Sequence, residues 1–205
     1  MKKRTVLIIF IVLTIVSIAW MIIDYLGLLR LYMLKRKSSL ENLIKQYSSI
    51  ERAGKPDEKI VISFSVSEKN KERLINFINS ILDQTVRVDD IIAVNNTKGD
   101  LSEIKDVAKI IPCGIDYGNL NKVIYPLIRE KNNDAIIISL DENTIYDKDY
   151  IEKMYELQKS RPQTLLYNEK VLICSPNMFK TCLFNQDEQY DMNKIKSLCS
   201  NYEKI

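Results

Sequence analysis

The sequence of 205 residues contains no histidine. This absence excludes Ser-His-Asp and Cys-His catalysis, zinc sites built on histidine, and histidine as a general base. Acid–base chemistry must therefore fall to carboxylates, lysine, tyrosine or water. Cysteine is scarce too, with four residues and no C-x-x-C pair. That pattern gives little support for zinc and predicts free thiols in a reducing compartment, with a disulfide as the open alternative.

Glycine and proline are also sparse, with five of each, and this argues against long disordered regions. The formal net charge is only +3, and much of the basic excess precedes residue 38, beside an apolar N-terminus. Such a distribution is typical of membrane-flanking charge, and we expect no nucleic-acid partner. Neither G-x-G-x-x-G nor G-x-x-x-x-G-K-[ST] occurs, which disfavours dinucleotide binding and NTP hydrolysis.

A long apolar run at the N-terminus, residues 6–23, contains no charge and no proline. About 18 residues at about 1.5 Å each nearly cross a hydrocarbon core of about 30 Å. We therefore predict a basic tip over residues 1–4, a single transmembrane helix over 5–27 and a spacer over 28–58. A cleaved signal peptide, with its site at Ser17-Ile18-Ala19, is the alternative. The continuation of the apolar run to residue 23 favours the uncleaved anchor.

The spacer carries apolar residues at helical spacing, so part of it is predicted to be an amphipathic helix: Leu40, Leu43, Ile44, Tyr47 and Ile50. Its apolar face is expected to pack on the following domain, with the membrane surface as the alternative. A helix-breaking stretch over residues 53–57 then marks the boundary of a domain at 59–205.

From residue 59 onward, patterns typical of strands and helices alternate. This order predicts right-handed βαβ crossovers and an α/β, Rossmann-like fold, with a mostly parallel sheet flanked by helices. Ser67, Asp147 and the pair Asp100 and Glu103 are expected to cap helices, and Pro126 to kink or shorten one. The expected strands are 60–66, 90–95, 109–113 and 135–140, with a hairpin at 164–167 and 171–174. The first expected helix follows Ser67 and carries an apolar stripe over residues 74–82. The other expected helices are 100–107, 119–128, 147–160 and 192–202.

The buried strand at 135–140 ends abruptly in Asp141-Glu142-Asn143. Open α/β sheets bind ligands beyond the carboxyl ends of their strands. In an extended segment, Asp141 and Asn143 direct their oxygens to the same side, which suits Mg²⁺ or Mn²⁺. A plain acidic turn is the alternative. The predicted topology brings the same edge together from four segments: residues 65–67, 95–97, 116–121 and 141–143.

At these residues the chain resembles family 2 glycosyltransferases, which have the GT-A fold, over roughly residues 59–160. Asn79-Ser-Ile-Leu-Asp-Gln-Thr85 is similar to the family's helix ending in S-I-L-x-Q-T. Asp116-Tyr-Gly-Asn-Leu-Asn-Lys122 is similar to a D-Y-G-x-x-x-K stretch of one branch. The segment 134–153 resembles I-I-x-x-D-D-D-x-x-Y followed by D-Y-I-E-K. The specific part is the joint match of Lys122, Asp141, Tyr146 and residues 150–153.

The resemblance implies a membrane-anchored glycosyltransferase of hexosyltransferase type. It would transfer a sugar from a nucleotide-sugar donor, with UDP favoured, to a glycan or lipid-linked acceptor. A divalent metal, Mn²⁺ or Mg²⁺, would be weakly held by Asp141 and Asn143. The resemblance identifies no catalytic base. The residues it places at the donor nucleotide are Ser65, Ser67, Asn95, Asn96, Gly118 and Lys122.

The departures from the family keep an alternative open. Asn143 stands where the family usually has an acid, and Asn95 and Asn96 replace acids at the second strand. The part after the metal motif, which normally supplies the acceptor site and a base, shrinks to 164–205. The alternatives are a catalytically degenerate binding or assembly subunit and a Rossmann-like domain with an unrelated ligand. The unassigned carboxylates in that part are Asp187, Glu188 and Asp191.

Membrane orientation is close to a tie, because basic residues flank both ends of the apolar run. A glycan on the sequon Asn95-Asn96-Thr97 would lie at the predicted nucleotide edge. Bacterial-type enzymes also draw on cytosolic nucleotide sugars. We therefore expect a single-pass membrane protein whose domain faces the cytosol.

Overall fold

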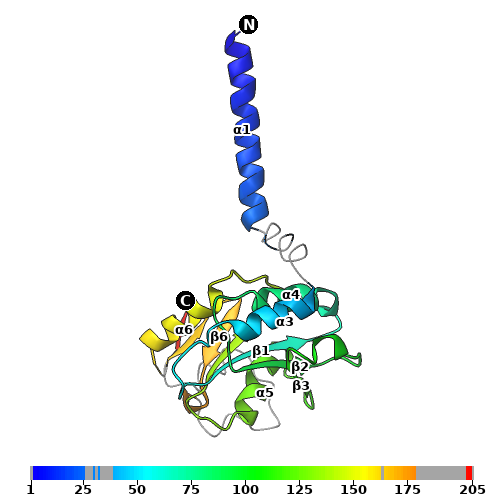
Figure 1. Ribbon diagram of the computed structural model, residues 1–205, viewed down its shortest axis with the longest axis vertical. Coiled ribbons are helices and arrows are strands. Elements are labelled where there is room, and N and C mark those ends of the chain that lie inside the picture. The colour runs from blue at the N-terminus through cyan, green and yellow to red at the C-terminus, as the bar shows by residue number, and fades with distance from the viewer. Residues whose placement is uncertain are drawn as a thin grey trace. The chain divides into compact units, whose positions relative to one another are not determined.

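The computed structural model describes residues 2–25, 30, 32, 39–162, 164–178 and 202–204 (Figure 1). The chain divides into two compact units, Met1–Ser39 and Leu40–Ile205. Carboxylates 187, 188 and 191, and the helix expected at 192–202 up to residue 201, lie outside the described residues. Tyr202–Lys204 forms a strand.

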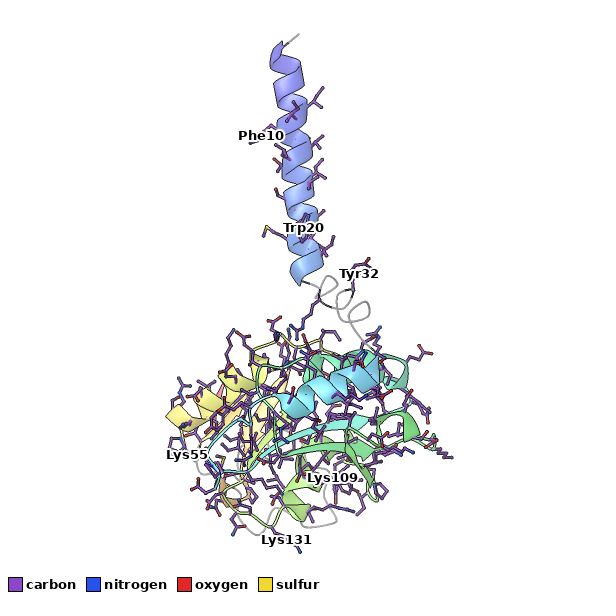
Figure 2. The ribbon with its side chains drawn as sticks, in the orientation of Figure 1. Phe10, Trp20, Tyr32, Lys55, Lys109 and Lys131 are labelled. Carbon is purple, nitrogen blue, oxygen red and sulfur yellow. The ribbon has the colours of Figure 1, made fainter. Side chains whose placement is uncertain are left out.

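The first unit contains one long helix, α1, over Lys2–Tyr25. Its side chains are described for residues 8–23, and all of them are exposed. Figure 2 shows Phe10 and Trp20 projecting from the helix, and they are 69% and 56% exposed. Over the part of the chain that the structure describes, no helix combines the length and apolarity needed to cross a membrane.

The second unit is built on a seven-stranded sheet of order β3-β2-β1-β4-β6-β5-β7. Strands β3, β2, β1 and β4 run parallel, while β6 is antiparallel to β4 and forms a hairpin with β5. The α/β fold with a mostly parallel sheet and the hairpin, both predicted from the sequence, are thus confirmed. The strands are β1 Ile60–Val66, β2 Asp90–Asn95, β3 Lys109–Pro112, β4 Ile136–Leu140, β5 Leu165–Tyr167, β6 Val171–Cys174 and β7 Tyr202–Lys204.

Two apolar cores cover the two faces of this sheet, because alternate strand residues point to opposite sides. In β1, Ile62 and Phe64 belong to the larger core, and Val61 belongs to the smaller one. Figure 1 shows α3, α4 and α6 on one face of the sheet and α5 on the other. These helices span Leu40–Ser49, Leu74–Leu82, Tyr150–Ser160 and Asn121–Arg129, respectively. β1 is buried at every position, as a strand covered on both faces requires.

Helix α3 packs on the domain, as the sequence favoured. Leu43 is fully buried, and the hydroxyl of Tyr47 accepts a hydrogen bond from the Val88 N–H at 2.9 Å. Burial raises the pKa of Tyr47 to about 12, since the charged phenolate would lose its hydration there. The compact unit begins at Leu40, so α3, which the sequence analysis placed in the spacer, belongs to the same unit as the sheet.

The predicted helix caps at Ser67 and at Asp100 with Glu103 are wrong. The Ser67 N–H donates to Asn70 Oδ1 at 2.8 Å, and a 3-10 turn precedes α4, so Ser67 lies too far upstream to cap it. Asp100 accepts from the Ser102 N–H at 2.9 Å, but only a 3-10 turn over Ser102–Ile104 follows, and its N-cap position is Leu101, which makes no side-chain cap bond. Both segments close local turns through Asn or Asp side chains in place of a helical cap.

The predicted cap at Asp147 is also wrong, because a distant glutamine takes that role. Gln84 Oε1 accepts from the Ile151 N–H at 3.0 Å, at the start of α6. Gln84 Nε2 donates to the backbone carbonyls of Ser80 at 2.8 Å and of Asp147 at 2.7 Å. One buried side chain therefore joins the end of α4 to the beginning of α6.

Candidate functional site at the carboxyl ends of the parallel strands

The sheet reverses its winding direction between β1 and β4, since β2 and β3 lie on one side of β1 and β4 lies on the other. Such a switch point leaves a crevice beyond the carboxyl ends of the two strands, where open α/β sheets bind ligands. Helix α5 packs across β1, β2 and β4 at this place. The predicted edge is therefore the one that the topology opens.

Two adjoining cavities occupy this edge. The first, which we call the β1–β2 cavity, has a volume of about 330 Å³ and includes Ser65, Ser67, Asn96, Asp116 and Gly118 in its lining. The second, the hairpin cavity, has a volume of about 410 Å³ and includes Lys122, Asp141, Asn143, Asn168 and Lys170. Asn119 and Glu142 line both cavities, so a ligand larger than either cavity can extend across the boundary between them.

Seven of the eight residues predicted for the site line these cavities. Asn95 is the exception and lines neither. Its Oδ1 accepts from the Thr97 N–H at 2.9 Å and from the Thr97 hydroxyl at 2.8 Å. Asn95 therefore shapes the turn after β2 and is not among the side chains facing either cavity.

The loop before α5 is held by Asp116 and Asn121, neither of which the sequence analysis assigned. Asp116 Oδ1 accepts from the Gly118 N–H and from Asn121 Nδ2, both at 2.8 Å. Hydrogen bonds from the Asn96 side chain, Asn121 and Gly118 lower the pKa of Asp116. Gly118 has φ +63°, and a Cβ there would meet no atom within 4 Å, so the backbone conformation alone favours glycine. This turn explains the Asp-Tyr-Gly-x-x-Asn spacing.

The chain after β4 turns, and the extended geometry expected for Asp141 and Asn143 is wrong. The N–H and the Nδ2 of Asn143 both donate to Asp141 Oδ1, at 3.2 and 3.1 Å. The Thr144 hydroxyl donates to Asp141 Oδ2 at 3.2 Å. The amide of Asn143 therefore presents its nitrogen, not its oxygen, to the carboxylate.

The buried side chain of Tyr146 fixes the beginning of this turn. Its hydroxyl accepts from the Asp141 N–H at 2.8 Å and donates to the Lys170 carbonyl at 2.7 Å. Burial raises the pKa of Tyr146. The side chain thus ties the end of β4 to the turn of the β5–β6 hairpin, and it keeps Asp141 at the mouth of the hairpin cavity.

Glu142 lies at the boundary between the two cavities, and the sequence analysis did not assign it. Asn70 Nδ2 donates to Glu142 Oε1 at 2.6 Å, and Lys122 Nζ lies 3.6 Å from Glu142 Oε2. The two charged side chains are only 12% and 18% exposed. Glu142 Oε2 is buried without a hydrogen-bond partner among the described residues. Position in Asp-Glu-Asn was the available signal for Glu142, whereas nothing local indicates Asn70.

The donor set for a metal is small. Among the described residues, no group of three or more Asp, Glu or Cys side chains is arranged to hold a metal ion. Asp141 provides a carboxylate, and Asn143 would provide an oxygen only after rotation of its amide. A divalent cation prefers six or more oxygen ligands, so these residues fit one only together with the oxygens of a bound ligand.

No protein-family model matches the chain, and no curated protein matches it. A fold shared by many functions does not by itself name an activity. The functional argument therefore depends on the chemistry of the two cavities.

Proposed function

We propose that this domain binds a nucleotide sugar, with UDP as the favoured nucleotide, and transfers the sugar to a glycan or lipid-linked acceptor. The observation that carries the proposal is the pair of adjoining polar cavities at the switch point, with Lys122 near their boundary. A nucleotide sugar has two neutral polar ends joined by a diphosphate. The cavities offer two polar compartments that share Asn119 and Glu142, and the partly buried Lys122 lies 3.6 Å from the shared Glu142.

The β1–β2 cavity receives the nucleoside in this proposal. Ser65, Ser67 and Asn96 offer hydroxyl and amide groups that can hydrogen-bond a base or a ribose. Asp116 holds the loop that closes the cavity. The sugar lies in the hairpin cavity, near Asn168 and Lys170.

Lys122 receives the diphosphate, because its ammonium group is a compact positive charge with little exposure to water. The Lys122 ammonium group lies 3.6 Å from the Glu142 carboxylate. A diphosphate must therefore compete with the Glu142 carboxylate for Lys122. The Glu142–Lys122 pair is thus expected to weaken donor binding.

Asp141 and Asn143 would hold a divalent cation together with the diphosphate oxygens. When bound, such a cation stabilises the negative charge that develops on the leaving nucleoside diphosphate. Asp141 holds the single carboxylate of this pair at the cavity mouth, through Tyr146 and the hairpin. With one carboxylate in the donor set, metal affinity is expected to be low.

A second candidate function is nucleotide binding without turnover, in a subunit that assists an active transferase. The observation that favours it is the amide of Asn143, whose nitrogen already donates to Asp141. A metal-dependent enzyme would need this amide to turn and the carboxylate to exchange its partners. A binding subunit would need neither.

Calorimetric titration of the full-length protein with UDP, with and without Mn²⁺, tests both functions. The proposal predicts binding that Mn²⁺ strengthens and that Asp141→Ala weakens about tenfold or more, while Asp106→Ala, an exposed matched control, binds as the wild type does. Release of UDP from nucleotide sugars, with water or a glycan as acceptor, then separates the two. Binding without turnover across donors and acceptors supports the second function, and absence of nucleotide binding contradicts both.

The proposal includes anchoring of the chain by the apolar N-terminal segment, residues 5–27, as a single-pass membrane helix, with the domain in the cytosol. Its support is the apolar run of the sequence and the exposure of every described α1 side chain, as at Met21, which is 72% exposed. Alkaline carbonate extraction is expected to leave the chain in the membrane fraction, and protease added to sealed vesicles or cells should reach the domain only from the cytosolic side. Extraction into the soluble fraction would contradict the anchor, and lumenal protection would contradict the orientation.

A further inference from the structure

Helix α5 contains a proline, Pro126, in its interior. In an α-helix each carbonyl accepts from the N–H four residues later. The Lys122 carbonyl would therefore bond the nitrogen of residue 126, but proline has no N–H to donate. A buried carbonyl without a partner is costly, so Lys122 needs another donor.

Two buried serines on neighbouring strands provide that donor. Ser63 on β1 and Ser139 on β4 are register partners in the parallel pair, and both are fully buried. Their hydroxyls lie 2.6 and 3.0 Å from the Lys122 carbonyl oxygen, and 2.9 Å from each other. Serine inside a buried strand is otherwise unfavourable, because its hydroxyl must be hydrogen-bonded.

The hydrogen-bonding capacities match this arrangement. A carbonyl oxygen has two lone pairs, and each hydroxyl has one proton. Both serines can donate to Lys122 at once, or one can donate to the other, which then donates to Lys122. In either case the Lys122 carbonyl oxygen, which has no helical donor because residue 126 is proline, accepts its hydrogen bonds from the sheet.

We infer that Ser63 and Ser139 are positioning residues, which use the carbonyl freed by Pro126 to fasten the first turn of α5, and with it Lys122, to the two strands that form the switch point. The part that concerns ligand binding rests on the proposed function, in which Lys122 receives the diphosphate. An ordinary helix would tie the Lys122 carbonyl to its own next turn. Because of Pro126, the Lys122 carbonyl bonds to serines of β1 and β4 in place of its own helix. The position of Lys122 is therefore set by the two strands that border the crevice.

Unfolding of the full-length protein tests the hydrogen bonds without any ligand. The double variant Ser63→Ala/Ser139→Ala is expected to unfold about 4–8 °C lower than the wild type. In a Pro126→Ala background the loss should fall to half or less, because the substituted alanine restores an N–H for the Lys122 carbonyl. An equal loss in both backgrounds overturns the inference that the serines replace the helical bond.

UDP affinity tests whether the serines act through Lys122. The serine double variant is expected to bind UDP about fivefold to tenfold more weakly, and to show no further weakening in a Lys122→Ala background. Gln158→Ala is the matched control: Gln158 is also buried and donates to backbone carbonyls, those of Arg161 and Thr164, but it lines neither cavity. It should lower stability while leaving UDP affinity unchanged. Wild-type affinity in the serine variants overturns the positioning role and leaves the proposed function intact.

A measurement on Lys122 itself decides the case in which UDP does not bind, an outcome that would overturn the proposed function. Reductive ¹³C-methylation labels the lysine amines, and Lys122→Arg assigns the Lys122 resonance. The serine double variant should shift this resonance, and Gln158→Ala should not. An unchanged Lys122 resonance in the serine variants overturns the inference, whatever UDP does.

Discussion

Two buried polar groups of this domain differ in how far their hydrogen bonds are satisfied. Gln84 uses its carbonyl and its amide in three hydrogen bonds of 2.7–3.0 Å that join α4 to α6. Glu142, at the boundary of the cavities, has one carboxylate oxygen bonded to Asn70. The other is buried 3.6 Å from Lys122 and has no hydrogen-bond partner in the described part of the chain. Buried polar groups are normally satisfied. The first arrangement is therefore typical of a scaffold, and the second of a site that a ligand rearranges.

The motifs that carry the family resemblance divide along the same line. The Ser-Ile-Leu-Asp-Gln-Thr run contributes Gln84, which lies 1% exposed inside the scaffold. The hydroxyl of Tyr146, from the later motif, also bonds backbone groups, those of Asp141 and Lys170. Lys122 and Asp141 face the cavities. A resemblance carried partly by scaffold residues supports the fold more directly than it supports an activity.

The largest expected effect lies on the scaffold side. Gln84→Ala is expected to lower the free energy of unfolding by about 2–4 kcal/mol. The substitution leaves the Ile151 N–H without its hydrogen-bond acceptor and opens a cavity in the buried interior. Chemical denaturation measures this loss. Gln46→Ala, at an exposed position of α3, should change stability by less than about 0.5 kcal/mol. If the two variants lost similar amounts of unfolding free energy, the conclusion that Gln84 stabilises the packing of α4 on α6 would be contradicted.

Tyr47 extends the scaffold to α3 and makes it sensitive to alkali. Its folded pKa of about 12 lies above the ordinary value of 10, so the unfolded state loses its proton first as pH rises. Stability from this group is complete below about pH 10 and declines as pH rises toward about 12, by up to about 2.7 kcal/mol. Unfolding midpoints measured across this range should decline less steeply in Tyr47→Phe. Tyr32→Phe, at a residue 59% exposed, should leave the profile as in the wild type.

The cavity side is tested by Glu142→Gln. Glutamine keeps an oxygen for Asn70 but removes the charge opposite Lys122. We expect UDP affinity to rise about fivefold to tenfold, which corresponds to about 1.0–1.4 kcal/mol. Calorimetry at fixed ionic strength measures it, with Glu103→Gln as an exposed control. Weaker binding in Glu142→Gln would mean that the carboxylate contacts the ligand and does not compete with it.

The smallest effect is expected at Asp116, which is exposed although it is hydrogen-bonded. Its pKa is lowered in the folded state by Asn96, Asn121 and Gly118, so its contribution to stability is present above the ordinary Asp pKa, near 3.9, and is lost as pH falls through the lower folded value. Unfolding midpoints between pH 6 and pH 3 should fall less steeply in Asp116→Asn than in the wild type. If the unfolding midpoints of the wild type and of Asp116→Asn fell equally with pH, these hydrogen bonds would not stabilise the charged form of Asp116 over its protonated form.

The sequence by itself determined the elements of the domain and the edge at which the polar residues gather. Its strands are short β-branched runs, and its helices carry apolar stripes, so local patterns sufficed for the α/β sheet and for the placement of Asp141 at the end of a strand. Lys122, which lies in α5, was placed at the site by the family resemblance alone. The caps were wrong at Ser67 and Asp147. A cap can come from a residue far along the chain, as Gln84 does for α6, and local spacing carries no sign of it.

Only the tertiary structure decided which polar groups meet. The Asn70–Glu142 bond joins residues 72 positions apart, and the Ser63–Ser139 contact joins residues 76 apart. The sequence did show Pro126, and so a carbonyl at Lys122 without its helical partner. It did not show that serines from two adjacent strands would supply the missing hydrogen bonds, because strand order and register depend on the packing of the whole sheet.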